Sequence, residues 1–184
     1  EIIKNFRDKT AWLIFGLIYI FGSMISLIYL RNIDSLISTP FTFLLFAGVM
    51  VNDSMAYIVG KTLGGPKILP KISPKKTYAG LFGGLIGSVL FIFLCDNYFL
   101  NSFTEFSLNN KDKIFLVFVF NIIGFFGDSF ESFIKRKADV KDSSGLLLGH
   151  GGMLDRLDSL ILTTPVTMFY VIAYYLWVKK SNQF

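Results

Sequence analysis

Hydrophobic residues gather in five long runs that polar segments separate. The runs cover residues 11–30, 40–60, 78–94, 114–134 and 157–178. Each run is about 20 residues long, the length that a helix needs to cross the hydrocarbon core of a bilayer. The pattern predicts an all-α integral membrane protein with about five transmembrane helices and a polar site on its cytoplasmic side.

The third run and the fifth run carry local signals. Four small residues in the third run favour close contact between helices; they are Gly80, Gly83, Gly84 and Gly87. Pro165 lies within the fifth run, and because proline has no backbone N–H, we expect a kink or a fresh start there. We expect a loop at residues 61–77, which hold five lysines and three prolines, and a polar connection at residues 95–113.

Composition agrees with a membrane protein. The hydrophobic fraction is 53% and the mean hydropathy is +0.56, above the usual values for a soluble domain. A net charge of +5 would suggest nucleic acid as a partner of a soluble protein, but membrane topology explains it better here, so we expect no nucleic acid partner. Cys95 is the single cysteine, which excludes an internal disulfide and a cysteine-based metal site. The sequence does not begin with Met, so we expect residues 1–184 to form a single transmembrane catalytic domain that lacks further N-terminal helices.

Basic residues are unequally divided between the two sides of such a bundle. The N-terminal segment and the connections at residues 61–77 and 135–156 hold 13 Lys and Arg residues, whereas the opposite side holds five. Cytoplasmic segments are the richer ones in membrane proteins. The count predicts that these three segments face the cytoplasm.

That orientation places the acidic residues of three runs at one depth. They are Asp53, Asp128, Glu131, Asp155 and Asp158. Carboxylates within membrane helices are costly unless they have a function. Carboxylates bordered by lysines fit a site that binds a divalent cation and a polyphosphate together. For Glu131 and Asp158, an interfacial or helix-capping role is an equal alternative.

Residues 132–159 differ most from the apolar runs around them. They hold nine of the 31 charged residues and the one histidine, His150. Residues 149–152 read Gly-His-Gly-Gly, which leaves backbone amides open to an anion, although such a run is also common in simple turns. His150 could equally be a structural hydrogen-bonding residue, and the run at residues 73–77 could be a basic loop that touches anionic lipid.

The chain resembles the phosphatidate cytidylyltransferase family over about residues 51–160. The family signature appears with intact spacing at Ser132, Lys135-Arg136, Lys141-Asp142, His150-Gly151-Gly152, Asp155-Arg156 and Asp158. Two further segments resemble the family. The first is Asp53-x3-Tyr57-x2-Gly60-Lys61 followed by residues 73–77, and the second is Gly127-Asp128 before Glu131-Ser132. Leu148 departs from the family, which usually has proline there.

The resemblance implies an enzyme that condenses CTP with phosphatidate to give CDP-diacylglycerol and pyrophosphate in phospholipid biosynthesis. It implies Mg2+ as cofactor with K+ as a second ion, a membrane lipid partner, and a bacterial inner membrane location with the active site facing the cytoplasm. A homodimer is one option for its assembly.

The resemblance also implies roles for individual residues. The expected metal ligands are Asp128, Asp155 and Glu131. The expected catalytic residues are Asp128, Asp155, Lys135, Arg136 and His150. The expected substrate-binding residues are Asp53, Tyr57, Lys61, Ser73, Lys75, Lys76, Thr77, Ser132, Lys141, Asp142, Gly151, Gly152, Arg156 and Asp158.

The chemistry of this reaction suits the residues. The phosphate monoester of phosphatidate is already anionic, so it needs no strong general base, and a metal ion and cationic side chains supply the charge neutralisation that the step requires.

A lipid kinase or another CTP-dependent membrane nucleotidyltransferase is the first alternative, and a kinase would need a base such as Asp128 or His150. An ion transporter is the second, but a transport path should place acids at several depths, whereas we expect none in the outer halves of the runs. CDP-alcohol phosphotransferases use a different aspartate motif, which is absent.

Overall fold

The computed structural model describes residues 2–100, 108–140, 143 and 154–181. It is mainly helical and contains α1 (Ile2–Asn32), α2 (Ser35–Leu63), α3 (Tyr78–Leu94), the π-helix η1 (Cys95–Leu100), α5 (Asn110–Phe118), the π-helix η2 (Val119–Ile123), α6 (Gly124–Lys137) and α7 (Leu154–Ser181). Consecutive helices join into five segments that are long and apolar enough to cross a membrane. The prediction of five transmembrane helices is confirmed.

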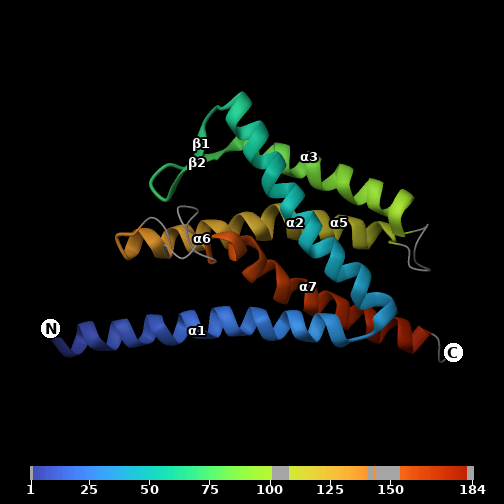
Figure 1. Ribbon diagram of the computed structural model, residues 1–184, viewed down its shortest axis with the longest axis horizontal. Helices are drawn as coiled ribbons and strands as arrows, with labels where there is room; N and C mark the ends of the chain where they lie inside the picture. Colours follow the sequence, from blue (N-terminus) through green and yellow to red (C-terminus); the bar gives the residue numbers. More distant parts are fainter. Residues whose placement is uncertain (1, 101–107, 141–142, 144–153, 182–184) are drawn as a thin grey trace.

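The five segments run back and forth, with α2 crossing the others at a steep angle (Figure 1). The chain reverses at each connection, so the end of α2, the end of α6 and the start of α7 lie towards the same end of the bundle as the N-terminus. Many large apolar side chains face outward, including Leu13, Ile18 and Phe82, as expected of a surface in contact with lipid.

A short β-hairpin occupies part of the segment that was expected to be a loop. β1 (Lys67–Leu69) pairs antiparallel with β2 (Ser73–Thr77), and the Ile72 N–H closes the turn by donating to the Leu69 carbonyl oxygen at 3.2 Å. Before the hairpin, Gly64 ends α2 with a positive φ of 64°, a conformation that glycine adopts without strain. β2 then leads directly into α3, so the hairpin is fixed against the bundle.

The glycine face of α3 packs against α2, as the sequence predicted. A Cβ atom on Gly83 would lie 2.5 Å from Val59, and one on Gly87 would lie 2.6 Å from Met55. Glycine at these positions therefore permits the two helices to approach closely.

Of the kink or fresh start expected near Pro165, the fresh start is excluded, because α7 is continuous from Leu154 to Ser181 with the proline inside it. The side chains of Thr163, Thr167 and Val171 are completely buried against the bundle. Packing on both sides of the proline holds the segment in one helix despite the missing backbone donor.

Candidate active site

A cavity of about 380 Å³ opens at the hairpin end of the bundle. Its walls come from the second half of α2, from β2, from the start of α3, from η2 and α6, and from the start of α7. Nine residues predicted from the sequence line it, and they are Asp53, Tyr57, Ser73, Lys75, Lys76, Thr77, Asp128, Asp155 and Asp158. Seven others line it that the site prediction missed, and they are Asn52, Ala56, Gly80, Leu81, Asn121, Phe125 and Ser159.

Four carboxylates from three helices share this cavity. α2 contributes Asp53, α6 contributes Asp128, and the first turns of α7 contribute Asp155 and Asp158. The convergence that the sequence predicted is thus present, while the roles of these side chains as metal or substrate ligands stay predictions.

Lys76 crosses from the hairpin to α6. Its Nζ lies 3.0 Å from Asp128 Oδ2 and donates to Ser129 Oγ at 2.7 Å and to the Phe125 carbonyl oxygen at 3.2 Å. Burial lowers the pKa of the Lys76 amino group from its usual 10.5, and the neighbouring charge of Asp128 opposes that shift. Lys76 therefore carries a positive charge that is held in place beside a carboxylate.

Lys135 makes a second ion pair at the rim of the site. Its Nζ lies 2.6 Å from Asp155 Oδ1 and 3.4 Å from Glu131 Oε1. Asp155 also accepts hydrogen bonds at 2.9 Å from the backbone N–H and the hydroxyl of Ser143. Of the three carboxylates expected to bind metal, Asp128 is thus paired with Lys76, while Asp155 and Glu131 share Lys135.

A network of buried amide side chains lies next to the cavity and hydrogen-bonds to Asp53 in its wall. Asn52 Oδ1 accepts from Ser88 Oγ and from Asn121 Nδ2, both at 3.1 Å, and Asn52 Nδ2 donates to Asp53 Oδ1 at 3.2 Å. Asn121 lies in η2, a π-helical turn, and such turns are frequent at functional sites. The sequence signal that could have identified Asn52 and Asn121 is their position inside apolar runs. A buried amide is costly unless it is hydrogen-bonded, so two such residues indicate a buried polar network.

Thr77 has a clear structural role as well as a place in the cavity wall. It is the N-cap of α3, and its hydroxyl accepts the Gly80 N–H at 3.1 Å. This cap fixes the junction between the hairpin and the glycine-rich helix, and so places Lys75 and Lys76 at the cavity.

Other predicted residues lie near the cavity without lining it in the described part of the chain. Ser132 Oγ donates to Asp128 Oδ1 at 3.4 Å. Arg136 Nε donates to the Ile72 carbonyl oxygen at 3.4 Å, which ties the end of α6 to the hairpin turn. Lys61 Nζ donates to Tyr57 Oη at 3.4 Å and lies over the same ring. Ser132 therefore contacts a cavity carboxylate, whereas Arg136 and Lys61 lie around its edge.

Five predicted residues lie outside the described residues, and they are Lys141, Asp142, His150, Gly151 and Gly152. Arg156 belongs to α7, but its side chain likewise lies outside the described part of the chain. Their predicted roles are not tested by the fold.

The donor set suits a hard cation that arrives with a phosphate. In the described ranges, no group of three His, Cys, Asp or Glu side chains is arranged to hold a metal ion. Mg2+ is usually bound by one or two carboxylates together with substrate phosphates and water, not by a complete protein cage. The oxygen ligands at Asp128 and Asp155 fit that mode of binding.

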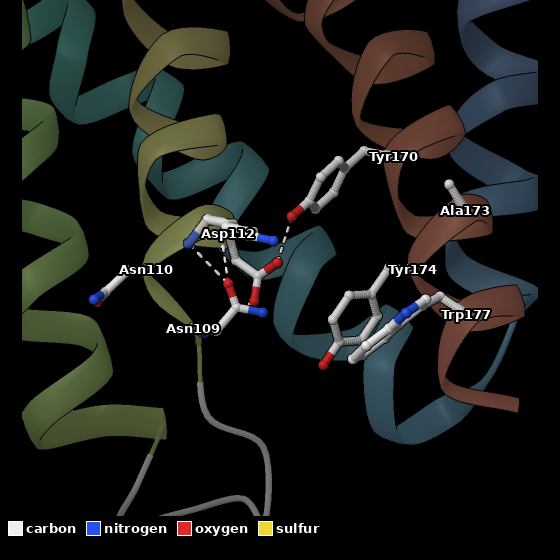
Figure 2. Close-up of a pocket in the computed structure, with 8 residues that line it drawn as sticks. Asn109, Asn110, Asp112, Tyr170, Ala173, Tyr174 and Trp177 are labelled. Atoms are coloured by element: carbon white, nitrogen blue, oxygen red, sulfur yellow. Dashed lines mark hydrogen bonds between the residues drawn. The ribbon is translucent and has the colours of Figure 1, made fainter. Parts of the chain in front are cut away.

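A second cavity lies at the opposite end of the bundle (Figure 2). It is larger, about 500 Å³, but Tyr170, Tyr174 and Trp177 dominate its wall. Its one carboxylate, Asp112, already accepts hydrogen bonds from the Tyr170 hydroxyl and the Asn109 backbone N–H. With no converging acids among its described lining residues, this cavity is a poor candidate for metal-assisted chemistry.

Comparison with known proteins gives the family. The model of the cytidylyltransferase family matches residues 2–174. The chain is 39% identical over 175 residues to the phosphatidate cytidylyltransferase of Rickettsia bellii, covering 92% of this chain and 73% of that relative. It is 40% identical over 157 residues to the phosphatidate cytidylyltransferase of Aquifex aeolicus, covering 83% of this chain and 54% of that relative. Because the family model covers nearly the whole of this chain, the chain belongs to the cytidylyltransferase family.

Proposed function

We propose that this chain forms the catalytic part of a membrane enzyme that transfers a cytidylyl group from CTP to phosphatidate. The products are CDP-diacylglycerol and pyrophosphate. Relatives that bear the name phosphatidate cytidylyltransferase support this assignment. The observation that carries it is the single cavity shared by four carboxylates and by Lys75 and Lys76.

The reaction joins two anions. An oxygen of the phosphatidate phosphate attacks the α-phosphorus of CTP, and the bond from that phosphorus to the bridging oxygen of the β-phosphate breaks, so that pyrophosphate leaves. The attacking phosphate monoester is already deprotonated, and no side chain has to remove a proton from it. Lys75 and Lys76 would neutralise phosphate oxygens and orient the triphosphate, since both line the cavity.

The proposal includes Mg2+ held by Asp128 and Asp155, with K+ as a second ion. The bound Mg2+ would supply charge neutralisation on the phosphate oxygens. The hydrogen bond from Ser132 to Asp128 and those from Ser143 to Asp155 would orient the two carboxylates for that purpose.

The proposed location is the bacterial inner membrane, with the hairpin end of the bundle in the cytoplasm. The basic residues support this orientation, with 13 of the 18 Lys and Arg in the segments at that end. CTP would then enter from the cytoplasm, while phosphatidate would bring its headgroup to the same depth. The homodimer stays an expectation, which light scattering of the detergent-solubilised protein would check.

A lipid kinase is the competing activity, and isotope position separates the two. The purified protein is incubated with phosphatidate or diacylglycerol, Mg2+ and CTP labelled at either the α- or the γ-phosphate. We expect the α-label to enter the lipid fraction with phosphatidate and the γ-label to appear in pyrophosphate. Transfer of the γ-label to diacylglycerol, with the α-label left in CDP, would contradict the proposal.

Ion transport is disfavoured by where the acids lie. The outer halves of the expected runs hold no acid, but the helices extend beyond those runs, and Asp96 and Asp112 are buried there in η1 and α5. Both are engaged in structural contacts, Asp96 with Lys113 at 2.6 Å and Asp112 with Tyr170. The middle of each span carries no acid in the sequence, so the two groups do not form a continuous path.

A further inference from the structure

Glu131 is a buried carboxylate that the cavity does not explain. It lies on α6 with 3% of its surface exposed, and neither of its oxygens accepts a hydrogen bond from the residues that the structure describes. A buried carboxylate without hydrogen bonds is strongly disfavoured unless a nearby positive charge compensates for it. Lys135, one helical turn later, supplies that charge at 3.4 Å.

Lys135 is shared between two carboxylates on different helices. Its ammonium group is closer to Asp155 on α7, at 2.6 Å, than to Glu131 on its own helix, at 3.4 Å. Asp155 lines the cavity, whereas Glu131 is not among its described lining residues. The lysine therefore connects a carboxylate that lines the cavity with one that is not among its described lining residues.

α1 contributes a buried hydroxyl group next to α6. The Tyr19 ring packs edge-on against Phe130, the neighbour of Glu131, with ring centroids 5.6 Å apart. Its hydroxyl is buried and has no hydrogen-bond partner in the described structure. Tyr19 thus contributes a buried hydroxyl group whose donor is unused in the described structure.

We propose that Glu131 is a positioning residue that receives the Lys135 ammonium group when a divalent cation binds Asp155. This inference rests on the proposed function in that it takes Asp155 as a metal ligand. A divalent cation and an ammonium group 2.6 Å from the same carboxylate oxygen repel each other, so binding of the cation requires the lysine to leave. A second carboxylate at 3.4 Å receives the lysine after a small movement and keeps its charge compensated. Glu131 then sets the affinity for the cation without touching it.

A double-mutant cycle measured by Mn2+ binding tests this role. Electron paramagnetic resonance reports free and bound Mn2+ in the full chain, without CTP or lipid, for the wild type, Glu131→Gln, Lys135→Met and the double variant. We expect Glu131→Gln to weaken Mn2+ binding about fivefold or more, a usual size for coupling between sites. Lys135→Met should strengthen binding because the competing cation is gone, and Glu131→Gln should add no weakening in that background.

Direct ligation by Glu131 gives a different pattern. It would make Glu131→Gln weaken Mn2+ binding equally in both backgrounds, which would overturn the positioning role. Unchanged affinity in Glu131→Gln, or no saturable Mn2+ binding to the wild type, would overturn it too.

A matched control and an independent readout complete the design. Asp139→Asn removes an exposed carboxylate at the same end of the bundle, at a φ of 54° that asparagine tolerates, and should leave Mn2+ affinity unchanged. Failure of cytidylyl transfer with a normal Mn2+ cycle would reject the proposed function alone. If the Mn2+ cycle does not show the expected pattern but cytidylyl transfer is normal, only the proposed movement of Lys135 from Asp155 to Glu131 would be rejected.

Discussion

At the scale of single residues, the negative charge of two cavity carboxylates is compensated by lysines from other elements. Lys76 comes from the hairpin to Asp128, and Lys135 comes from α6 to Asp155. Each pair holds a carboxylate at a fixed position beside the cavity. Removing one charge therefore changes both the donor set and the placement of the opposing lysine.

Asp128→Asn and Asp155→Asn should each abolish turnover, with a loss of about a hundredfold or more, the usual size for removing one preorganised electrostatic group. Asparagine keeps the shape of the side chain but not its charge, so the variants should still insert into the membrane. Transfer of α-labelled CTP to lipid and recovery in the membrane fraction measure the two properties. Near-normal turnover of either variant would remove that residue from the metal site, and Asp139→Asn is the control.

The activity should depend on pH through Lys76. Burial lowers the pKa of this amino group from its usual 10.5, and only the protonated form attracts phosphate. When the pH rises through this lowered pKa, Lys76 loses its proton and kcat/KM for CTP should fall. The fall should occur at a lower pH than it would if Lys76 had the pKa of an exposed lysine. Lys76→Arg keeps its charge at high pH and should move the alkaline fall upward. Profiles recorded from roughly pH 7 to 10 check this, and identical alkaline limbs in the two proteins would contradict it.

At the scale of elements, the sequence predicts packing well and local geometry less well. The glycines of α3 indicated a close helix pair because small residues in an apolar run let two helix backbones approach each other. The hairpin was not predicted, since β1 is three residues long and its stretch is rich in lysine and proline. The contact of Lys76 with Asp128 joins residues 52 positions apart, and local periodicity carries no information about such pairs. The roles of Asn52 and Asn121 depend on the π-helical turn η2, which helical spacing cannot anticipate.

The α2–α3 contact provides a test at this scale. A Cβ atom on Gly84 would lie 2.7 Å from Asn52 Oδ1 and 3.0 Å from Asn121 Nδ2, so Gly84→Ala should disturb the amide network beneath Asp53. We expect a loss of about 1–3 kcal/mol in unfolding free energy, typical of overpacking, together with reduced turnover. Thermal unfolding in detergent measures the first effect. Gly22→Ala on α1 meets no atom within 4 Å and should unfold at the same temperature or higher, and equal losses in both variants would contradict the packing role.

At the scale of the whole molecule, the alternation of five segments brings the acids of α2, α6 and α7 to one end. Three separate parts of the chain contribute because α2 and α6 run towards that end and α7 leaves from it (Figure 1). The count of segments and the convergence of acids could be predicted, since both follow from the length and order of apolar runs. The orientation of the bundle in the membrane is a separate property, which the distribution of basic residues predicts.

Labelling of single cysteines would test that orientation. Cys95 is buried and is the one native cysteine, so Cys95→Ala gives a background without thiols. Lys71→Cys places a thiol on the exposed hairpin turn, and Asn110→Cys places one on an exposed position at the start of α5, at the other end. A maleimide that cannot cross membranes should label Asn110→Cys in intact spheroplasts and should label Lys71→Cys only after permeabilisation. The reverse pattern would place the cavity outside the cell, where CTP from the cytoplasm could not reach Lys75 and Lys76, and the proposed function would fail on topology alone.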